Sequence, residues 1–280
     1  MKKCVLLLGG SGFIGEATMC CLERAGWRVT KGVRNRRAVE EELEIDLTDA
    51  ARVLALRDQY HFDAIVHLAA NVGWGGATDA EMFVPNVLST GCLSFLAREW
   101  GAQLIFASAA IVCGDRTQRI DQQSPIAPEN PYAKSKWLAE QLIVASSARH
   151  CILRIGGVFG PRGPSHLGLN RAIDGVIRGE APTMIGLGSA LRNYVYVKDV
   201  ASMLTFALEK SILGVHLVAG SEILSIRSML EEVCRVLSPS IKPSNQMGSE
   251  GANQIIVASS FLPAARKFSD ALIDIKNSLP

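Results

Sequence analysis

The sequence has little net charge, no paired cysteine motif and no long apolar run. Its 29 Lys and Arg against 27 Asp and Glu give a formal net charge of +2, which is too small to indicate a nucleic acid or a membrane surface as a partner. The seven cysteines are odd in number and none has C-x-x-C spacing. Neither a disulfide framework nor a zinc or other metal site is therefore predicted, and a reducing cytoplasm is the expected compartment.

The apolar runs are too short for a signal peptide or a membrane span. The run that follows Met1-Lys2-Lys3 covers only Cys4–Leu8 before the first glycine, which is shorter than the roughly seven residues of the shortest signal-peptide cores. No stretch approaches the roughly 18 uninterrupted apolar residues of a membrane helix. A content of 48% hydrophobic and 20% charged residues predicts a compact, soluble globular protein.

Short apolar runs alternate with helical patterns through the first 160 residues. Their near-continuous hydrophobicity predicts a parallel sheet that is covered on both faces. The predicted strands are Cys4–Leu8, Trp27–Val33, Ala64–Leu68, Gln103–Ser108 and Cys151–Ile155. This alternation predicts an α/β fold with a Rossmann-type, doubly wound parallel sheet.

The composition changes after residue 160, where the segment Gly160–Pro164 is rich in Gly and Pro. We predict a dinucleotide-binding domain over residues 1–160, to which residues 193–219 return. Residues 161–192 and 220–280 are predicted to form a small substrate-binding cap. Within the cap, the amphipathic pattern of Ile226–Leu237 predicts a helix.

A glycine-rich turn joins the first strand to the first helix, which is predicted over Phe13–Ala25 and capped by Gly26. Glycine allows the backbone to approach a phosphate closely and the helix to pack tightly on the strand. The helix amides then face the anion. In this context the pattern predicts dinucleotide binding. The candidate cofactor-binding residues are Gly9, Gly12, Phe13, Ile14 and Gly15.

The residues after the second strand bear on the choice of cofactor. An NAD-selective site places an acidic residue there, whereas this chain has Gly32-Val33-Arg34-Asn35-Arg36-Arg37. Because a guanidinium suits a 2′-phosphate, we expect Arg34 to favour NADP over NAD. The alternative is a solvated basic loop without a role in binding.

A tyrosine and a lysine lie four residues apart in a later helical segment. Tyr132 and Lys136 therefore project from one helix face, and Pro131 suits the first turn of that helix. A nearby ammonium favours the phenolate and brings the pKa of the tyrosine closer to a useful acid–base range. An ordinary exposed pair is the alternative.

With these motifs, the chain resembles the extended short-chain dehydrogenase/reductase superfamily, in its NAD-dependent epimerase/dehydratase branch. The resemblance covers nearly the whole length. The further motifs that carry it are Asp46–Asp49, His67–Ala70, Asn86–Thr90, Leu153–Pro161 and Arg192–Ala201.

The resemblance implies roles for the matching residues. Tyr132 would move the proton of a hydroxyl or ketone, and Lys136 would bind the nicotinamide ribose and help to ionise Tyr132. Hydride would pass between a substrate carbon and the nicotinamide. Arg192 matches the arginine that holds the substrate pyrophosphate in nucleotide-sugar members, a role that suits its forked guanidinium. The implied cofactor contacts are Asp46 at the adenine, with Leu47, Leu68, Ala69, Ala70 and Asn86 beside it or lining the cofactor site.

Four positions depart from the family pattern. The third catalytic residue of the family, a Ser or Thr, is Ala109 here. Ser108 precedes it and points to the opposite face of a continuing strand, so it reaches the substrate only if the backbone shifts after the strand ends. Loss of this donor is expected to cost on the order of 10²-fold in rate. Gly157 replaces an Asn that often contacts nucleotide sugars, and Ala110-Ile111 replace the Asp-Glu pair of dehydratases, so dehydration is not expected.

The sequence therefore predicts an NAD(P)-dependent oxidoreductase that epimerises or reduces a nucleotide sugar, with Ala109, Tyr132, Gly157 and Arg192 at the substrate. Two alternatives stay open. One is an NADPH-dependent reductase of a non-sugar carbonyl compound, as Arg34 and Gly157 suggest. The other is a catalytically weak NAD(P)-binding sensor or partner protein, because of Ala109. The resemblance also implies a cytoplasmic homodimer, formed through the helices near residues 86–100 and 132–147.

Overall fold

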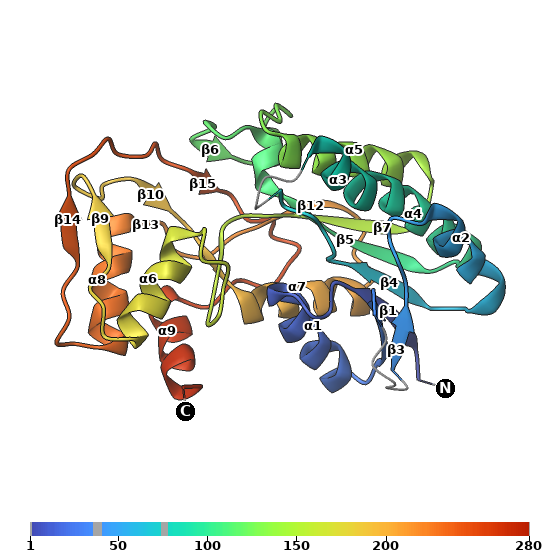
Figure 1. Ribbon diagram of the computed structural model, residues 1–280, viewed down its shortest axis with the longest axis horizontal. Coiled ribbons are helices and arrows are strands. Elements are labelled where there is room, and N and C mark those ends of the chain that lie inside the picture. Colours follow the sequence, from blue (N-terminus) through green and yellow to red (C-terminus); the bar gives the residue numbers. More distant parts are fainter. Residues whose placement is uncertain (1, 36–40, 74–77, 280) are drawn as a thin grey trace. The chain divides into compact units, whose positions relative to one another are not determined.

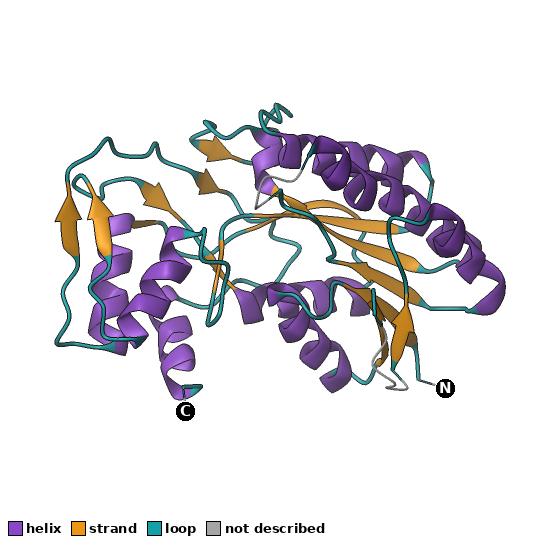
Figure 2. Cartoon of the chain, in the orientation of Figure 1, coloured by secondary structure: helices purple, strands orange, loops and turns teal. Residues whose placement is uncertain are grey.

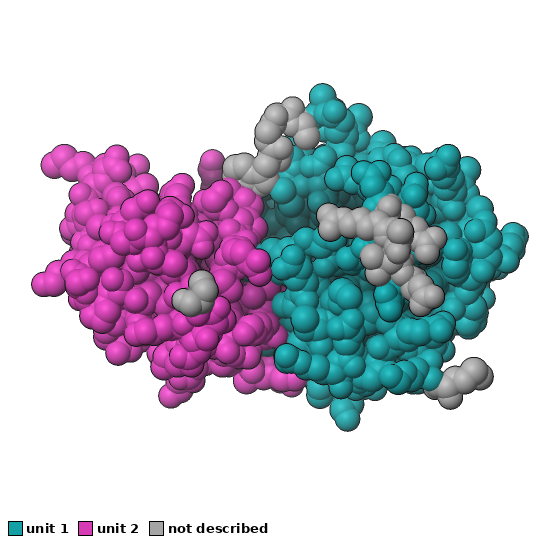
Figure 3. All heavy atoms as spheres, turned by 60° about the horizontal axis from the view of Figure 1, so that its bottom comes forward, with its two compact units in different colours: residues 1–115, 125–154, 201–216 teal, residues 116–124, 155–200, 217–280 magenta. Residues whose placement is uncertain are grey.

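The computed structural model describes residues 2–35, 41–73 and 78–279. The chain divides into two compact units, which Figure 3 colours separately. Unit 1 comprises residues 1–115, 125–154 and 201–216, and unit 2 comprises residues 116–124, 155–200 and 217–280. This division assigns residues 116–124, 155–160, 193–200 and 217–219 to unit 2, whereas the sequence suggests that they belong to the first domain. The domain limits drawn from the sequence stay a prediction.

A seven-stranded sheet has the strand order β12-β7-β5-β4-β1-β2-β3 (Figure 1). Its strands are β1 (Cys4–Leu8), β2 (Arg28–Val33), β3 (Glu42–Glu44), β4 (Ala64–His67), β5 (Gln103–Ala109), β7 (His150–Ile155) and β12 (Gly214–Val218). β1 pairs in parallel with both β2 and β4. Because the strand order reverses beside β1, the carboxyl ends of β1 and β4 form the crevice where such sheets bind ligands. The predicted doubly wound α/β fold is confirmed.

Helices cover both faces of this sheet in unit 1. Figures 1 and 2 show α1 and the unit 1 part of α7 on one face, and α2, α4 and α5 on the other. Their bounds are α1 (Phe13–Arg24), α2 (Ala50–Gln59), α4 (Ser89–Trp100), α5 (Pro131–Ala145) and α7 (Val197–Glu209). As predicted, Gly26 follows α1 with a left-handed φ of 86°, a conformation that glycine adopts without strain.

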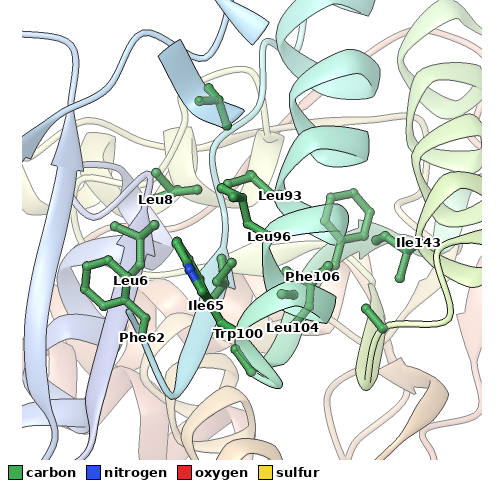
Figure 4. Packing of buried hydrophobic residues seen from close by; sticks show 14 of the residues in the cluster. Leu6, Leu8, Phe62, Ile65, Leu93, Leu96, Trp100, Leu104, Phe106 and Ile143 are labelled. Carbon is green, nitrogen blue, oxygen red and sulfur yellow. The ribbon is translucent and has the colours of Figure 1, made fainter. Parts of the chain in front are cut away.

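One core holds the strand ends of unit 1 in place (Figure 4). Leu8 of β1 and Phe106 of β5 pack in the same buried cluster as Leu93 of α4 and Ile143 of α5, each of these side chains being 0 or 1% exposed. Burial of a side chain of this size contributes about 1.5–3 kcal/mol to stability. The core thus fixes the backbone from which the site residues project.

Short strand pairs and three helices make up unit 2. The helices are α6 (Gly168–Ile177), α8 (Ile226–Leu237) and α9 (Phe268–Asn277), of which α8 matches the predicted helix. The pairs are β6 (Arg119–Ile120) with β15 (Ile255–Ile256), β8 (Val158–Phe159) with β11 (Val195–Tyr196), β9 (Thr183–Ile185) with β14 (Ser244–Gln246), and β10 (Leu191–Arg192) with β13 (Leu224–Ser225). Ala172, Met184 and Leu230 form a small core that links α6, β9 and α8.

A continuous helical stretch runs from α3 (Asp79–Phe83) through the π-helical turn η1 (Val84–Leu88) into α4. With 22 residues, it has the length and composition of a membrane span. Half of its most apolar window is buried inside the protein, and α4 packs against α2 and α5. These features are equally those of a core helix in a soluble protein.

Candidate functional site

The glycine turn after β1 leaves a cradle without side chains at the start of α1. Gly9 has a φ of +81°, and a Cβ there would lie 2.6 Å from the amide nitrogen of Ala69. A Cβ at Gly15 would lie 2.0 Å from the carbonyl oxygen of Gly9. Gly12 caps α1 without a side-chain hydrogen bond, so amides of the first turn stay available to an anion. The cradle therefore fits the pyrophosphate of a dinucleotide.

The segment after β4 lies beside this turn. The amide of Leu68 donates to the carbonyl of Leu8 at 2.9 Å, and Ala69 is the residue that approaches Gly9. Leu68 and Ala69 are half-buried and Ala70 is exposed. The structure thus brings these predicted cofactor residues to the same sheet edge as the glycines. Phe13 and Ile14 begin α1 and are half-buried.

An acidic and a basic residue stand where the cofactor's adenosine half is expected. The Asp46 carboxylate accepts hydrogen bonds from the hydroxyl (2.7 Å) and the amide (2.9 Å) of Thr48. These bonds lower the pKa of Asp46, and the charge of Arg34 adds to the effect. Arg34 is exposed after β2, and Leu47 is half-buried. Arg36 and Arg37, named with Arg34 in the sequence, lie outside the described residues.

Asn86 is almost fully buried, at 1% exposure, and joins two parts of the site. Its Oδ1 accepts from the Asn71 amide at 2.7 Å, and its Nδ2 donates to the Asn71 carbonyl at 2.8 Å. The same Nδ2 donates to Ser135 Oγ at 3.0 Å. Asn86 thus ties the segment after β4 to α5. Direct contact of Asn86 with the cofactor stays a prediction.

His67, at the end of β4, has a buried nitrogen without a partner. Its Nε2 lies 3.0 Å from the Thr90 hydroxyl, and that hydroxyl donates to the Asn86 carbonyl at 2.7 Å. The imidazole must therefore carry its proton on Nε2, which leaves Nδ1 as a bare acceptor. Nδ1 has no hydrogen-bond partner in the described part of the chain. Burial first, and then the charge of Lys136, lower the pKa of His67 to about 3.

The predicted acid–base pair lies on α5. Asn130 caps the helix by accepting from the Ala133 amide at 2.8 Å, and its Nδ2 donates to both carboxylate oxygens of Asp115 at 3.0 and 3.1 Å. Lys136 is buried, at 2% exposure, and its Nζ donates to the Ala107 carbonyl of β5 at 2.7 Å. The same Nζ lies 5.9 Å from the centre of the Tyr132 ring. Asn130 fixes the start of α5, and the Ala107 carbonyl fixes the Lys136 side chain. Tyr132 and Lys136 are therefore preorganised.

The pKa values of the pair differ from the sequence expectation. Burial raises the pKa of Tyr132 to about 12, so desolvation outweighs the attraction of the lysine for the phenolate. Burial also lowers the pKa of Lys136 to about 7, while the charge of Glu140 acts in the opposite direction. In the protein by itself the pKa of Tyr132 is thus raised by burial, and the effect of Lys136 on it stays a prediction. A bound cationic nicotinamide would favour the phenolate.

Ser108 lies in the interior rather than beside the pair. β5 continues through Ala109, so the backbone shift that Ser108 would need does not occur within the strand. The Ser108 hydroxyl donates to Glu140 Oε1 at 2.5 Å, and Arg154 holds the same carboxylate through Nη2–Oε2 (2.7 Å) and Nε–Oε1 (3.1 Å). This Ser108–Glu140–Arg154 cluster is not predicted from the sequence, although Glu140 stands four residues after Lys136. A catalytic role of Ser108 would require this bond to break.

Unit 2 contains a cavity of about 420 Å³ beside Arg192. Among its lining residues are Arg171, Glu180, Ile226, Met229, Leu230 and Glu250. Arg192 Nη1 donates to the carbonyls of Leu191 (2.8 Å) and Ala252 (2.5 Å).

The charges around this cavity favour an anionic ligand. Glu180 pairs with Arg178 at 3.0 Å, and Glu250 accepts from the Leu187 amide and the Ser189 hydroxyl. Glu180 is therefore paired with a cation, whereas Glu250 keeps its negative charge, because these hydrogen bonds lower its pKa. In contrast, neither Arg171 nor Arg192 has a carboxylate partner within residues 2–35, 41–73 and 78–279. The two guanidinium groups are left to attract an anion.

Gly157 precedes β8 and packs against Tyr194, which precedes β11. The Val195 amide donates to the Gly157 carbonyl at 2.9 Å. Tyr194 also lines the unit 2 cavity, so Gly157 packs against a residue of the cavity wall.

A doubly wound sheet with a glycine cradle at its switch point defines a dinucleotide-binding α/β protein. The sequence profile of the NAD dependent epimerase/dehydratase family matches residues 5–220. The chain belongs to this family, as the resemblance implied.

Known relatives and structures agree with this assignment. The chain is 26% identical over 227 residues to a putative UDP-glucose 4-epimerase of Methanocaldococcus jannaschii, and the alignment covers 73% of each chain. It is 29% identical over 241 residues to dTDP-glucose 4,6-dehydratase of Mycobacterium tuberculosis, covering 78% of this chain and 72% of the relative. The crystal structure of Thermus thermophilus UDP-glucose 4-epimerase in complex with NAD superposes with a TM-score of 0.80 at 25% identity, over 98% of both chains.

Proposed function

We propose that this protein is an NAD(P)-dependent enzyme that epimerises or reduces a nucleotide sugar. The observation that carries the proposal is the preorganised pair on α5, in which Lys136 is fixed by the Ala107 carbonyl at 2.7 Å and lies 5.9 Å from the Tyr132 ring. A sensor has no need of a lysine whose pKa is lowered to about 7 by burial. Relatives described as acting on UDP-glucose or dTDP-glucose support the substrate class.

The residues would divide the chemistry as follows. A bound nicotinamide would supply hydride transfer to and from a carbinol carbon. Tyr132 takes the hydroxyl proton as the C–H hydride leaves, so that the carbinol becomes a ketone, and it gives the proton back when the ketone is reduced. Lys136 holds the nicotinamide ribose and favours the phenolate by its charge. Return of hydride to the opposite face gives the epimer, and net reduction gives the alcohol.

Arg192 and Arg171 are proposed to bind the diphosphate of the substrate in the unit 2 cavity. Their unpaired guanidinium groups match phosphate oxygens, and a volume of about 420 Å³ falls within the usual range for small-molecule sites, which is roughly 300–1,000 Å³. Dehydration is not part of the proposal, because Ala110 and Ile111 carry no acid or base.

Turnover by purified protein with NAD or NADPH and a panel of nucleotide sugars and keto-sugar nucleotides tests the function. We expect turnover by the wild type and its loss in Tyr132→Phe, with cofactor affinity retained. Tyr60→Phe, at a 40% exposed tyrosine, is the matched control. Turnover of non-sugar carbonyl compounds alone would favour the reductase alternative. No turnover, with Tyr132→Phe binding cofactor like the wild type, would favour the sensor alternative.

The family is NAD-dependent, and we propose a preference for NADP in this chain. The proposal rests on Arg34, which replaces the acidic residue of NAD-selective sites. The dissociation constants of NADPH and NADH should differ at least several-fold in the wild type and converge in Arg34→Ala. Arg57→Ala, at an arginine paired with Asp58 at 2.9 Å, is the control. Equal constants in the wild type would refute the preference.

We also propose a cytoplasmic homodimer. Leu138 and Leu142 of α5 are 43 and 38% exposed, and Leu88 at the end of η1 is 55% exposed. Burial of such side chains in a helix–helix interface would remove apolar surface from water. Light scattering at micromolar concentration should give the dimer mass for the wild type and the monomer mass for Leu138→Glu. A monomeric wild type would refute the dimer.

A further inference from the structure

Tyr194 lies within the Arg192–Ala201 motif and lines the unit 2 cavity, but the resemblance assigns it no role. It stands between Arg192, at the end of β10, and β11, and it lines the same cavity as Arg192. Its side chain is half-buried. Burial raises the pKa of the Tyr194 phenol, against an opposing effect of the Arg192 charge. The phenol therefore stays protonated near neutral pH and can donate a hydrogen bond.

The ring of Tyr194 occupies the space that a side chain at position 157 would fill. A Cβ built on Gly157 would lie 2.4 Å from Cε1 and 2.5 Å from Cδ1 of Tyr194, which is well inside van der Waals contact. Any larger residue at position 157 would push the ring away. Gly157 and Tyr194 are thus a matched pair, in which the missing side chain of one admits the ring of the other.

The backbone on either side of Tyr194 is fixed by its neighbours. Asn193 is buried, and its side chain bonds to Ile256 through both amide atoms, at 2.7 and 3.0 Å, and to the Gly220 carbonyl at 3.2 Å. A Cβ at Gly220 would lie 2.1 Å from the Tyr194 carbonyl oxygen. Because the chain is held on this side and the ring rests on Gly157, Tyr194 is presented in one orientation before any ligand arrives.

The Tyr194 hydroxyl has no hydrogen-bond partner among residues 2–35, 41–73 and 78–279. The hydroxyl is not a buried unpartnered atom, so it is accessible to water or to a ligand. Beside it, the Nη2 and Nε groups of Arg192 also lack a protein acceptor in the same ranges, since the two bonds of Arg192 both use Nη1. These accessible donors of two side chains, both of which line the cavity, suit a ligand with several acceptor oxygens and a negative charge.

We propose that Tyr194 is a specificity-determining residue, which donates its phenolic hydrogen bond to the diphosphate of the nucleotide substrate beside Arg192. This proposal rests on the proposed function. The phenol would supply, from the next strand, the donor that Gly157 cannot. The Gly157–Tyr194 pair would then select for a substrate with a diphosphate over one with a single phosphate, because two separate donor groups need two sets of acceptor oxygens.

Calorimetric titration of the full-length protein with UDP and with UMP tests this role. Tyr194→Phe should weaken UDP binding roughly tenfold, as expected for one hydrogen bond to a charged acceptor, and should change UMP binding less. Tyr60→Phe should bind both as the wild type does. The NAD affinity of every variant should equal that of the wild type. This measurement serves as the control that unit 1 is intact.

A second variant tests the packing argument. Gly157→Ala should also weaken UDP binding, because its Cβ displaces the Tyr194 ring. In that background, Tyr194→Phe should add little, since the hydroxyl is already out of place. Full additivity of the two changes, or UDP affinity unchanged in Tyr194→Phe while Arg192→Ala loses it, would overturn the role of Tyr194.

The outcomes separate this inference from the proposed function. A wild type that binds neither UDP nor dTDP overturns both. UDP binding that depends on Tyr194, in a protein that turns over no nucleotide sugar, supports the inference and refutes the proposed function.

Discussion

The strongest prediction about stability concerns His67, because its burial ties folding to pH. His67 is 0% exposed, and its pKa falls from 6.5 to about 3 in the folded protein. A depressed pKa means that the unfolded chain binds more protons between these values. The contribution of His67 is therefore fully present above pH 6.5 and is lost as the pH falls toward 3. Between pH 7.5 and 5 the loss amounts to about 2 kcal/mol.

The assay is urea unfolding at pH 7.5 and pH 5, followed by tryptophan fluorescence. Other groups titrate in this interval, so the informative quantity is the pH-dependent loss of unfolding free energy in the wild type minus that in His67→Asn. We expect this difference to be about 2 kcal/mol. His61→Asn, at an exposed histidine, should leave the pH dependence unchanged. Equal pH dependence in the wild type and His67→Asn would refute the assignment of a buried, neutral His67.

Three further changes probe the site. Glu140→Ala should lower the unfolding free energy by about 3–5 kcal/mol in urea titrations, because it leaves Arg154 partly buried without its carboxylate; a loss under about 1 kcal/mol would contradict this. Lys136→Met should raise stability at pH 7 by roughly 1–3 kcal/mol while abolishing turnover, since a desolvated ammonium is removed; lower stability would show that the bond to Ala107 outweighs desolvation. Gly9→Ala should weaken NAD affinity at least about tenfold in a fluorescence titration. The reason is that the φ of +81° at Gly9, and the Ala69 amide nitrogen 2.6 Å from the added Cβ, exclude a side chain. Wild-type affinity of this variant would contradict the role of the glycine turn in cofactor binding.

The fold could be predicted from the sequence because the strands of a covered parallel sheet are nearly continuous apolar runs. β1 was predicted at its exact limits, and β5 extends only one residue further than predicted, to Ala109. β3 was not predicted, since Glu42–Glu44 has two charged residues in three. Its Glu42 is buried and pairs with Lys31 of β2 at 3.0 Å. A partner from another strand cannot be read from local hydropathy.

The site could be predicted in part. Glycine spacing and the i, i+4 relation of Tyr132 and Lys136 are local features, and they identify the cradle and the pair. The pKa values are not local, because they depend on how deeply the surrounding core buries α5. The same holds for the Glu140–Arg154 bond, which crosses from α5 to β7, and for the fit of Tyr194 against Gly157. Each depends on contacts between residues far apart in the chain.

The most direct test of the central claim is reduction of the bound cofactor by substrate. In the wild type loaded with NAD or NADP, addition of a UDP-hexose should produce the near-ultraviolet absorbance of reduced nicotinamide. In Tyr132→Phe, with unchanged cofactor and UDP affinities, the rate of that change should fall at least about 10²-fold, as expected for loss of a general base. A Tyr132→Phe variant that reduces the cofactor at the wild-type rate would contradict the claim that Tyr132 carries the proton in hydride transfer.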